Sequence, residues 1–216
     1  MSVSVAAPVL EFGVLDARGE RNSAAPLLRF DAHVSEQSGH EVFTIALSVQ
    51  IMFEPAKRSY DPETKERLVE MFGAPERWPQ TTNNFLWAEV DVLLPAFTGA
   101  TGFRIPLACT FDMEIAAAKY LYSLPGGVVP LLFNFTGSVF YRGEDGRIQV
   151  AKVPWDRDAR YELPVQTWRD LMAAHYPNGS WVRLGDQTME ALAARKAAEG
   201  LPTYDMVVAK LLENGS

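Results

Sequence analysis

The sequence predicts an α+β fold, in which antiparallel, sandwich-like β-sheets carry an inserted helix and a C-terminal helical region. Up to about Pro164, apolar and polar residues alternate in several runs, which is typical of strands with one buried and one solvated face. After Pro164 the apolar residues recur at helical spacing instead. Strands that are polar on one side favour antiparallel sheets packed face to face over a parallel sheet covered by helices.

The first two predicted strands are residues 28–34 and 43–53. The residues that we expect to face inward are Leu28, Phe30, Ala32 and Val34, followed by Phe43, Ile45, Leu47, Val49, Ile51 and Phe53. The polar segment 35–40 contains Gly39 and suits a hairpin connection between the two strands. The second strand is long enough to promote self-association if it lies at a sheet edge, so homo-oligomerisation stays open.

Four further strands are predicted over residues 86–94, 103–111, 129–141 and 148–153. In the first of these, Leu86 falls on the apolar face and Trp87 on the polar face. Pro106 cannot donate a hydrogen bond to a neighbouring strand, so it marks a sheet edge or a bulge. Cys109 falls on the inward face, where a thiol is inert. The turn residues 143–146 predict a hairpin between the last two strands.

Helix signals interrupt and follow the strands. Asp61-Pro62-Glu63 predicts a helix start, because it offers a capping carboxylate, a proline in the first turn and an acid near the positive end of the helix dipole. We expect this helix to end at Gly73 and to bury the apolar residues Leu68, Met71 and Phe72. Further helices are predicted over residues 114–124, 165–175, 186–199 and 203–214.

We expect one domain over residues 1–216, with a β-rich core over about 1–164 and a helical extension over about 165–216 that packs on the core. No Ser- or Gly-rich linker separates the two parts. Such a chain is long enough to build a hydrophobic core without a disulfide or a metal.

Composition excludes several classes of function. With 20 Lys and Arg against 27 Asp and Glu, the formal net charge is −7, which argues against a nucleic-acid partner. One cysteine and 3 scattered histidines predict no internal disulfide, no metal site and no cofactor, and they disfavour a nickel or iron carrier. The absence of a basic start and of a run of ~20 apolar residues predicts a cytoplasmic protein without membrane insertion.

The motifs of enzymes are also missing from the sequence: it has no phosphate-binding glycine loop and no nucleophile elbow. One candidate ligand or catalytic site remains, because Asp112 and Glu114 could form an acid–base pair beside Lys119 and Tyr120. The alternative is structural: Asp112 caps the helix that starts near Met113, and Glu114 lies in its first turn. The chemistry therefore leans away from an enzyme without excluding one.

Several tryptophans lie next to arginines, and these residue types dominate the centres of protein interfaces. The candidates for binding a partner protein are Arg77, Trp78, Trp87, Trp155, Arg157, Trp168 and Trp181. Arginine also stacks on aromatic rings inside a single protein, so the same residues could pack at the rim of the core.

The order of the segments resembles an uncharacterised bacterial family, a domain of unknown function. The resemblance covers about residues 26–214 and rests on short motifs, which are Arg58-Ser59-Tyr60, Arg77-Trp78, Phe111-Asp112-Met113-Glu114, Lys119-Tyr120-Leu121, residues 129–137, Val153-Pro154-Trp155 and Leu163-Pro164-Val165. It implies an association with uptake [NiFe]-hydrogenase genes, and it transfers no catalytic residues.

Two functions follow as hypotheses. The first is a non-enzymatic accessory or assembly protein that binds another protein, with a hydrogenase subunit or maturation factor as the partner implied by the resemblance. The alternative is an enzyme or small-ligand carrier with a polar-lined cavity near Asp112, Glu114, Lys119 and Tyr120.

Overall fold

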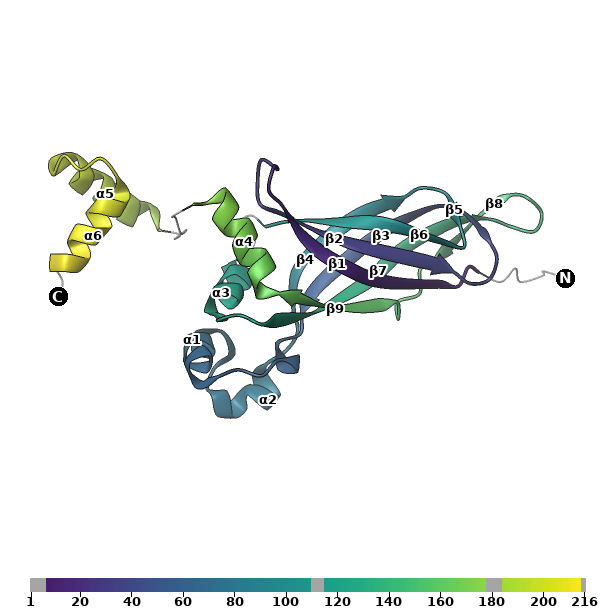
Figure 1. Ribbon diagram of the computed structural model, residues 1–216, viewed down its shortest axis with the longest axis horizontal. Helices are drawn as coiled ribbons and strands as arrows, with labels where there is room; N and C mark the ends of the chain where they lie inside the picture. The colour runs from purple at the N-terminus through teal and green to yellow at the C-terminus, as the bar shows by residue number, and fades with distance from the viewer. Residues whose placement is uncertain (1–6, 110–114, 178–183, 215–216) are drawn as a thin grey trace. The chain divides into compact units, whose positions relative to one another are not determined.

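The computed structural model describes residues 7–109, 115–177 and 184–214, and it divides into two compact units, residues 1–178 and 179–216. The first unit contains all the strands and the helices α1 to α4 (Figure 1). The second unit contains the helices α5 and α6.

Two antiparallel sheets form the first unit, which confirms the predicted fold class. The three-stranded sheet has the order β1-β2-β6, with β1 (Leu10–Glu20), β2 (Leu27–Glu36) and β6 (Ala100–Ala108). The six-stranded sheet has the order β4-β3-β7-β8, with β4 (Phe85–Leu94), β3 (Glu41–Phe53), β7 (Val128–Arg142) and β8 (Ile148–Lys152). The short β5 (Phe97–Thr98) pairs with β3, and β9 (Asp158–Pro164) pairs with β7.

The hydrophobic core lies between the two sheets. Phe12 of β1 stacks on Phe135 of β7 with ring centroids 4.4 Å apart. Phe30 of β2 meets Phe133 of β7 edge to face at 5.0 Å. Offset and edge-to-face pairs of this kind add to the energy of apolar burial. These rings therefore join one sheet to the other.

The regular parts of the strand predictions are confirmed. The predicted inward residues of 28–34 are buried, as are the odd positions from Ile45 to Phe53. Pro106 lies on β6, at the edge of its sheet. The long strand β3 is central, between β4 and β7, so its backbone does not form a free sheet edge.

Two β-bulges overturn the predicted facing of three residues. The register of β3 against β7 shifts between Val42 and Thr44, so Val42 is buried and Phe43 is 53% exposed. The register of β4 against β3 shifts next to Trp87, so Trp87 is buried and Leu86 is 50% exposed. The predictions for Phe43, Leu86 and Trp87 were wrong because a bulge inserts one residue and reverses the alternation beyond it.

The connection over residues 35–40 is not the predicted hairpin, because β2 and β3 belong to different sheets. Glu36, whose side chain is buried, organises this crossover. Its carboxylate accepts backbone hydrogen bonds from Val9 at 3.1 Å, Ser38 at 2.9 Å and His40 at 2.8 Å. Burial alone would raise the pKa of Glu36, but a hydrogen bond from the Ser38 hydroxyl, together with the three backbone bonds, outweighs burial and lowers the pKa below its ordinary value.

The substitution Glu36→Gln is expected to cost about 2 kcal/mol of stability at pH 7, because it removes charge-assisted hydrogen bonds from a buried site. The pKa of Glu36 in the folded state is below the ordinary value of 4.5, so its stabilising effect is complete above pH 4.5 and is lost as the pH falls through the folded-state pKa. The difference between wild type and variant should therefore shrink below about pH 4.5 in urea unfolding. The control, Glu41→Gln at an exposed ion pair, should change stability little.

Four α-helices and two 3₁₀ turns gather at one end of the sheets (Figure 1). They are η1 (Pro55–Lys57), α1 (Pro62–Phe72), η2 (Pro75–Arg77), α2 (Trp78–Thr81), α3 (Ile115–Ser123) and α4 (Val165–His175). The predicted helix start is confirmed, because Asp61 accepts hydrogen bonds from the backbone and the hydroxyl of Thr64 at 2.8 and 2.7 Å. Gly73 ends α1 with φ +78°. None of the described helices has the length and apolar character needed to span a membrane.

The second unit is a pair of helices, α5 (Asp186–Ala198) and α6 (Tyr204–Asn214). Glu199 joins them, because it forms ion pairs with Arg195 at 2.8 Å and with Lys210 at 2.9 Å. Val207 is buried, whereas its neighbour Val208 is 41% exposed. That residues 165–216 pack as a whole on the β-rich core stays a prediction.

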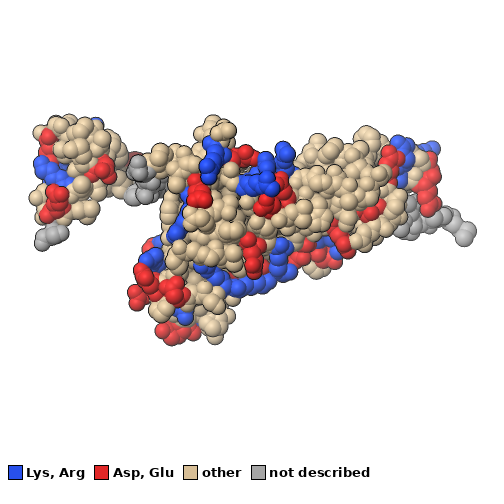
Figure 2. Space-filling view, in the orientation of Figure 1, with Lys and Arg blue, Asp and Glu red and all other residues tan. Residues whose placement is uncertain are grey.

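Charged side chains cover the outer face of the three-stranded sheet and form ion pairs both within and between its strands. Arg29 of β2 lies 2.6 Å from Glu20 of β1 and 3.3 Å from Asp31. Arg18 lies 2.8 Å from Asp16 on β1. On the face shown in Figure 2, Lys and Arg lie beside Asp and Glu and do not gather into a broad basic area.

Candidate functional site

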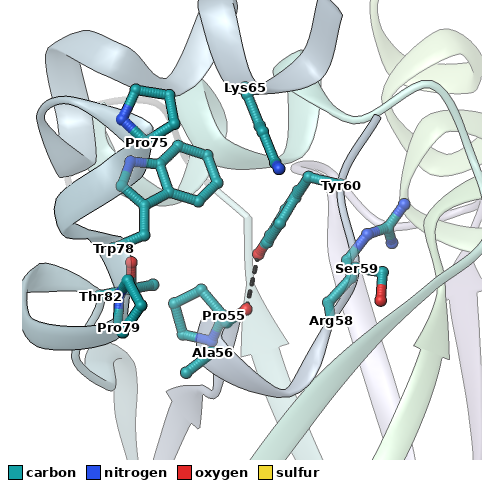
Figure 3. Close-up of a pocket in the computed structure, with 10 residues that line it drawn as sticks. All are labelled: Pro55, Ala56, Arg58, Ser59, Tyr60, Lys65, Pro75, Trp78, Pro79 and Thr82. Atoms are coloured by element: carbon teal, nitrogen blue, oxygen red, sulfur yellow. Dashed lines mark hydrogen bonds between the residues drawn. The ribbon is translucent and has the colours of Figure 1, made fainter. Parts of the chain in front are cut away.

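An open cleft of about 480 Å³ lies among η1, α1, η2 and α2. Ten residues line it, and all are drawn in Figure 3. Three of them are prolines, and Tyr60 and Trp78 provide aromatic walls. The volume falls in the range typical of ligand sites in proteins. The cleft is therefore the candidate functional site of the first unit.

Prolines shape this part of the chain. Pro55, Pro62 and Pro75 each lie in the first turn of a short helix, where the fixed φ of proline suits the helix and its missing N–H costs no hydrogen bond. The chain consequently turns three times between the end of β3 and the start of β4. The cleft is the space that these turns enclose.

The two aromatic walls are held at right angles. The rings of Tyr60 and Trp78 have centroids 5.3 Å apart and an interplanar angle of 89°. The indole N–H of Trp78 donates to the carbonyl of Gly73 at 2.9 Å, which anchors the ring to the end of α1. Phe72 packs edge to face behind Trp78 at 5.6 Å. Trp78 is 9% exposed, so a small part of the indole reaches the cleft, and its N–H is not free to bind a ligand.

Two tyrosine hydroxyls lie behind the cleft. The hydroxyl of Tyr60 donates to the carbonyl of Pro55 at 2.9 Å, and the hydroxyl of Tyr120 lies 2.7 Å from that of Tyr60. Because Tyr60 donates to Pro55, Tyr120 is the donor of the bond between the phenols. Burial raises the pKa of Tyr60 and that of Tyr120 above the ordinary value of 10.0, so both phenols are neutral at physiological pH. This pair positions the wall and is unsuited to proton transfer.

Arg58 links the cleft to the start of β7. Its guanidinium donates to the carbonyls of Gly126 and Val128, and its charge lies 5.9 Å from the ring centroid of Tyr60. The guanidinium of Arg58 therefore holds the chain at the start of β7, although the residue also lines the cleft. In Figure 3 the ring of Tyr60 separates the guanidinium from the space in front of Trp78.

Three polar side chains of the lining, Ser59, Lys65 and Thr82, form no hydrogen bond or ion pair with a described residue. Lys65 projects from α1 toward the space between Trp78 and Tyr60 (Figure 3) and forms no ion pair with any described residue. The hydroxyl of Thr82 is buried, in a residue that is 9% exposed, and it has no hydrogen-bond partner among the described residues. A buried hydroxyl without a partner costs free energy, so it is an unusual feature of a folded protein.

The predicted partner-binding residues are dispersed over the structure. Arg77 is exposed and Trp78 lines the cleft. Trp87 and Trp168 are buried, with Trp87 stacked on Phe53 at 4.7 Å. Trp155 is 89% exposed in the turn between β8 and β9, and the nearby Arg157 pairs with Asp156 at 3.6 Å. Trp181 lies outside the described residues, and a partner-binding role for the set stays a prediction.

The predicted ligand residues are not all described. Asp112 and Glu114 lie outside the described residues, as does the predicted cap of α3. Lys119 pairs with Glu70 at the surface, whereas Tyr120 is fully buried against Tyr60. The two described members of the set therefore point to different environments, and only Tyr120 lies near the cleft.

The sequence interpretation missed Tyr60, Lys65 and Thr82 as site residues. The available signal was compositional, since residues 55–82 hold four prolines, a tyrosine and a tryptophan within one helical insertion. The missing partner of Thr82 depends on packing and has no signature in the sequence. Among the described residues, no group of three or more His, Cys, Asp or Glu side chains could hold a metal ion.

Comparison with solved structures finds matches of low sequence identity and low TM-score. The CARDB domain of the PF1109 protein from Pyrococcus furiosus, in complex with di-metal ions, is 11% identical with a TM-score of 0.29, covering 76% of this chain and 93% of that chain. The putative ApaA protein from Bordetella pertussis is 11% identical with a TM-score of 0.24, covering 74% and 95%. A beta-glucosidase from Kluyveromyces marxianus is 11% identical with a TM-score of 0.28, covering 72% of this chain and 15% of that chain.

Sequence comparison assigns the chain more directly. No curated protein matches it. A family model, described as a family of unknown function, matches residues 7–216, which include both sheets, the cleft and the second unit. The match confirms the resemblance to a domain of unknown function. The chain therefore belongs to the family of unknown function DUF6084.

Proposed function

We propose that the protein is a non-enzymatic accessory protein that binds another protein through the cleft. The observation that carries this proposal is the cleft itself, whose walls are a tyrosine, a tryptophan and three prolines. Aromatic walls of this kind supply rigid contact area at low cost in conformational entropy. The hydroxyls of Tyr60 and Tyr120 beside the cleft are neutral and hydrogen-bonded to each other, which does not suit acid–base catalysis.

The partner that we propose is a bacterial [NiFe]-hydrogenase subunit or maturation factor in the cytoplasm. This part of the proposal rests on the resemblance of the segment order to a family associated with such genes. An assembly role requires binding and release of a partner, which an open cleft permits.

Affinity purification of the full chain from its own cells, followed by mass spectrometry, tests the proposal. We expect a hydrogenase subunit or maturation factor to be enriched, and we expect Trp78→Ala to lose it while Trp155→Ala retains it. Circular dichroism of the Trp78→Ala variant is needed to establish that it folds. Recovery of neither class of protein with the wild-type chain would refute the hydrogenase role.

A further inference from the structure

The cleft has a charge that differs from that of the chain. The chain carries a net charge of −7, whereas the lining holds two basic residues, Arg58 and Lys65, and no acidic one. Since Arg58 is engaged with two carbonyls, Lys65 is the free cation of the lining. A basic ligand would meet repulsion at Lys65, and a neutral ligand that covered the ammonium would desolvate it without compensation. An acidic group on the ligand satisfies it.

Thr82 adds a second, independent constraint. Its hydroxyl is buried and unpartnered among the described residues, so turning the hydroxyl toward a ligand in the cleft breaks no hydrogen bond inside the protein. In the view of Figure 3, the ammonium of Lys65 lies to the right of the indole of Trp78, and Thr82 lies below the indole. A ligand that meets both must extend along the indole.

The walls between these two groups favour an extended peptide. Apolar rings such as those of Tyr60 and Trp78 pack well against the pyrrolidine and aliphatic groups of a polyproline II segment. A segment in this conformation has no internal hydrogen bonds, so its carbonyls are available to a donor such as Thr82. A site for a small molecule would enclose most of the ligand, whereas this cleft is open to solvent.

We propose that the cleft binds an extended, proline-containing acidic segment of the partner protein, with a carboxylate at Lys65 and a main-chain carbonyl at Thr82. This inference rests on the proposed function, since it names the chemistry of the segment that the partner inserts. Lys65 determines the preference for an acidic residue. Thr82 fixes the position of the backbone.

Two labelled peptides test the role of Lys65 on the full chain: Pro-Pro-Glu-Pro-Pro and the matched Pro-Pro-Gln-Pro-Pro. Fluorescence anisotropy should show that the acidic peptide binds about tenfold more tightly, as expected for one charge-assisted contact. Lys65→Gln should abolish this difference, and Lys152→Gln, at an exposed lysine of β8, should preserve it. Equal binding of the two peptides, or a preference that survives Lys65→Gln, would overturn the proposal.

Two neighbouring threonines separate a binding role for Thr82 from a structural one. Thr82→Val should leave the melting temperature unchanged or raise it, because it removes an unpartnered hydroxyl, and it should weaken binding of the acidic peptide about threefold to tenfold. Thr81→Val should lower the melting temperature, since the Thr81 hydroxyl bonds to the carbonyls of Phe72 at 2.9 Å and Arg77 at 3.0 Å. A fall in the melting temperature of Thr82→Val without a loss of affinity would contradict the assigned role.

Two further experiments show whether the acidic-segment proposal or the proposed accessory function is the one that fails. Glutarate, a small dicarboxylate, should compete with the acidic peptide only at far higher concentration. If glutarate binds as tightly as the peptide, the ligand of the cleft is a small molecule and the acidic-segment proposal fails. If the Lys65→Gln variant co-purifies from cells with the same partner as the wild-type chain does, the acidic-segment proposal fails and the accessory function stands. If the peptide binds as expected but no partner is recovered, the hydrogenase role fails and the ligand chemistry stands.

Discussion

Gly137→Ala is expected to destabilise the protein by about 3 kcal/mol or more, because no side chain fits at this position. Gly137 has φ +144°, and a Cβ built there would lie 2.0 Å from the carbonyl oxygen of Ala46. The clashing atom belongs to the backbone of β3, the strand paired with this part of β7. Relief would therefore require the two central strands of the larger sheet to move apart.

The position of Gly137 explains why the strand needs such a residue. The first part of β7 pairs with β9 through residues 128–134, and the last part pairs with β8 through residues 138–142. Between these parts, the carbonyl of Gly137 accepts the N–H of Val153 at 3.0 Å. The glycine thus lies where β7 passes from one neighbour to the other.

Urea unfolding followed by circular dichroism measures this effect, and Gly102→Ala is the matched control. Gly102 also lies within a strand, but the nearest atom to its added Cβ is the carbonyl oxygen of Ala32 at 3.7 Å, an ordinary contact. We expect Gly102→Ala to change stability by less than about 1 kcal/mol. If Gly137→Ala yields no folded protein, limited proteolysis should still distinguish it from Gly102→Ala, and equal resistance of the two would contradict the prediction.

The sequence predicted the fold class because alternation survives in most strands. Where it failed, single inserted residues were responsible: the bulges at Phe43 and Trp87 interrupt patterns that look continuous in the sequence. Strand β1 was not predicted, since it contains two glycines and its own register shift between Val14 and Asp16. The segment 35–40 looked like a hairpin turn, because turn residues also suit a crossover between sheets.

The candidate site was less accessible to prediction than the fold. The cap of α1 by Asp61 follows from local sequence rules and is confirmed. The lining of the cleft comes from residues 55–82, but the position of its Tyr60 wall depends on the bond to the hydroxyl of Tyr120, which is far away in the sequence. The tryptophans were identified by type, but burial divides them, since Trp87 and Trp168 are buried and Trp155 is exposed. Residue type alone does not reveal this division.

The two phenylalanines of β3 offer a second test with a large effect. Phe53→Ala is expected to cost about 4 kcal/mol, because it leaves a cavity in the core. The ring of Phe53 is fully buried and lies 4.7 Å from that of Trp87, 4.8 Å from that of Phe85 and 5.2 Å from that of Tyr120. Phe43→Ala, on the same strand, should cost less than about 1 kcal/mol, since Phe43 is 53% exposed beyond the bulge.

The same pair of variants links the core to the cleft. Phe53 supports Tyr120, and the hydroxyl of Tyr120 in turn holds that of Tyr60, which forms a wall of the cleft. Phe53→Ala should therefore weaken binding of the acidic peptide even under conditions in which the variant is fully folded, whereas Phe43→Ala should leave binding unchanged. Parallel urea unfolding and peptide anisotropy measure both effects. A larger loss of stability in Phe43→Ala than in Phe53→Ala would mean that the register of β3 lacks the bulge, because without it both rings would face the core.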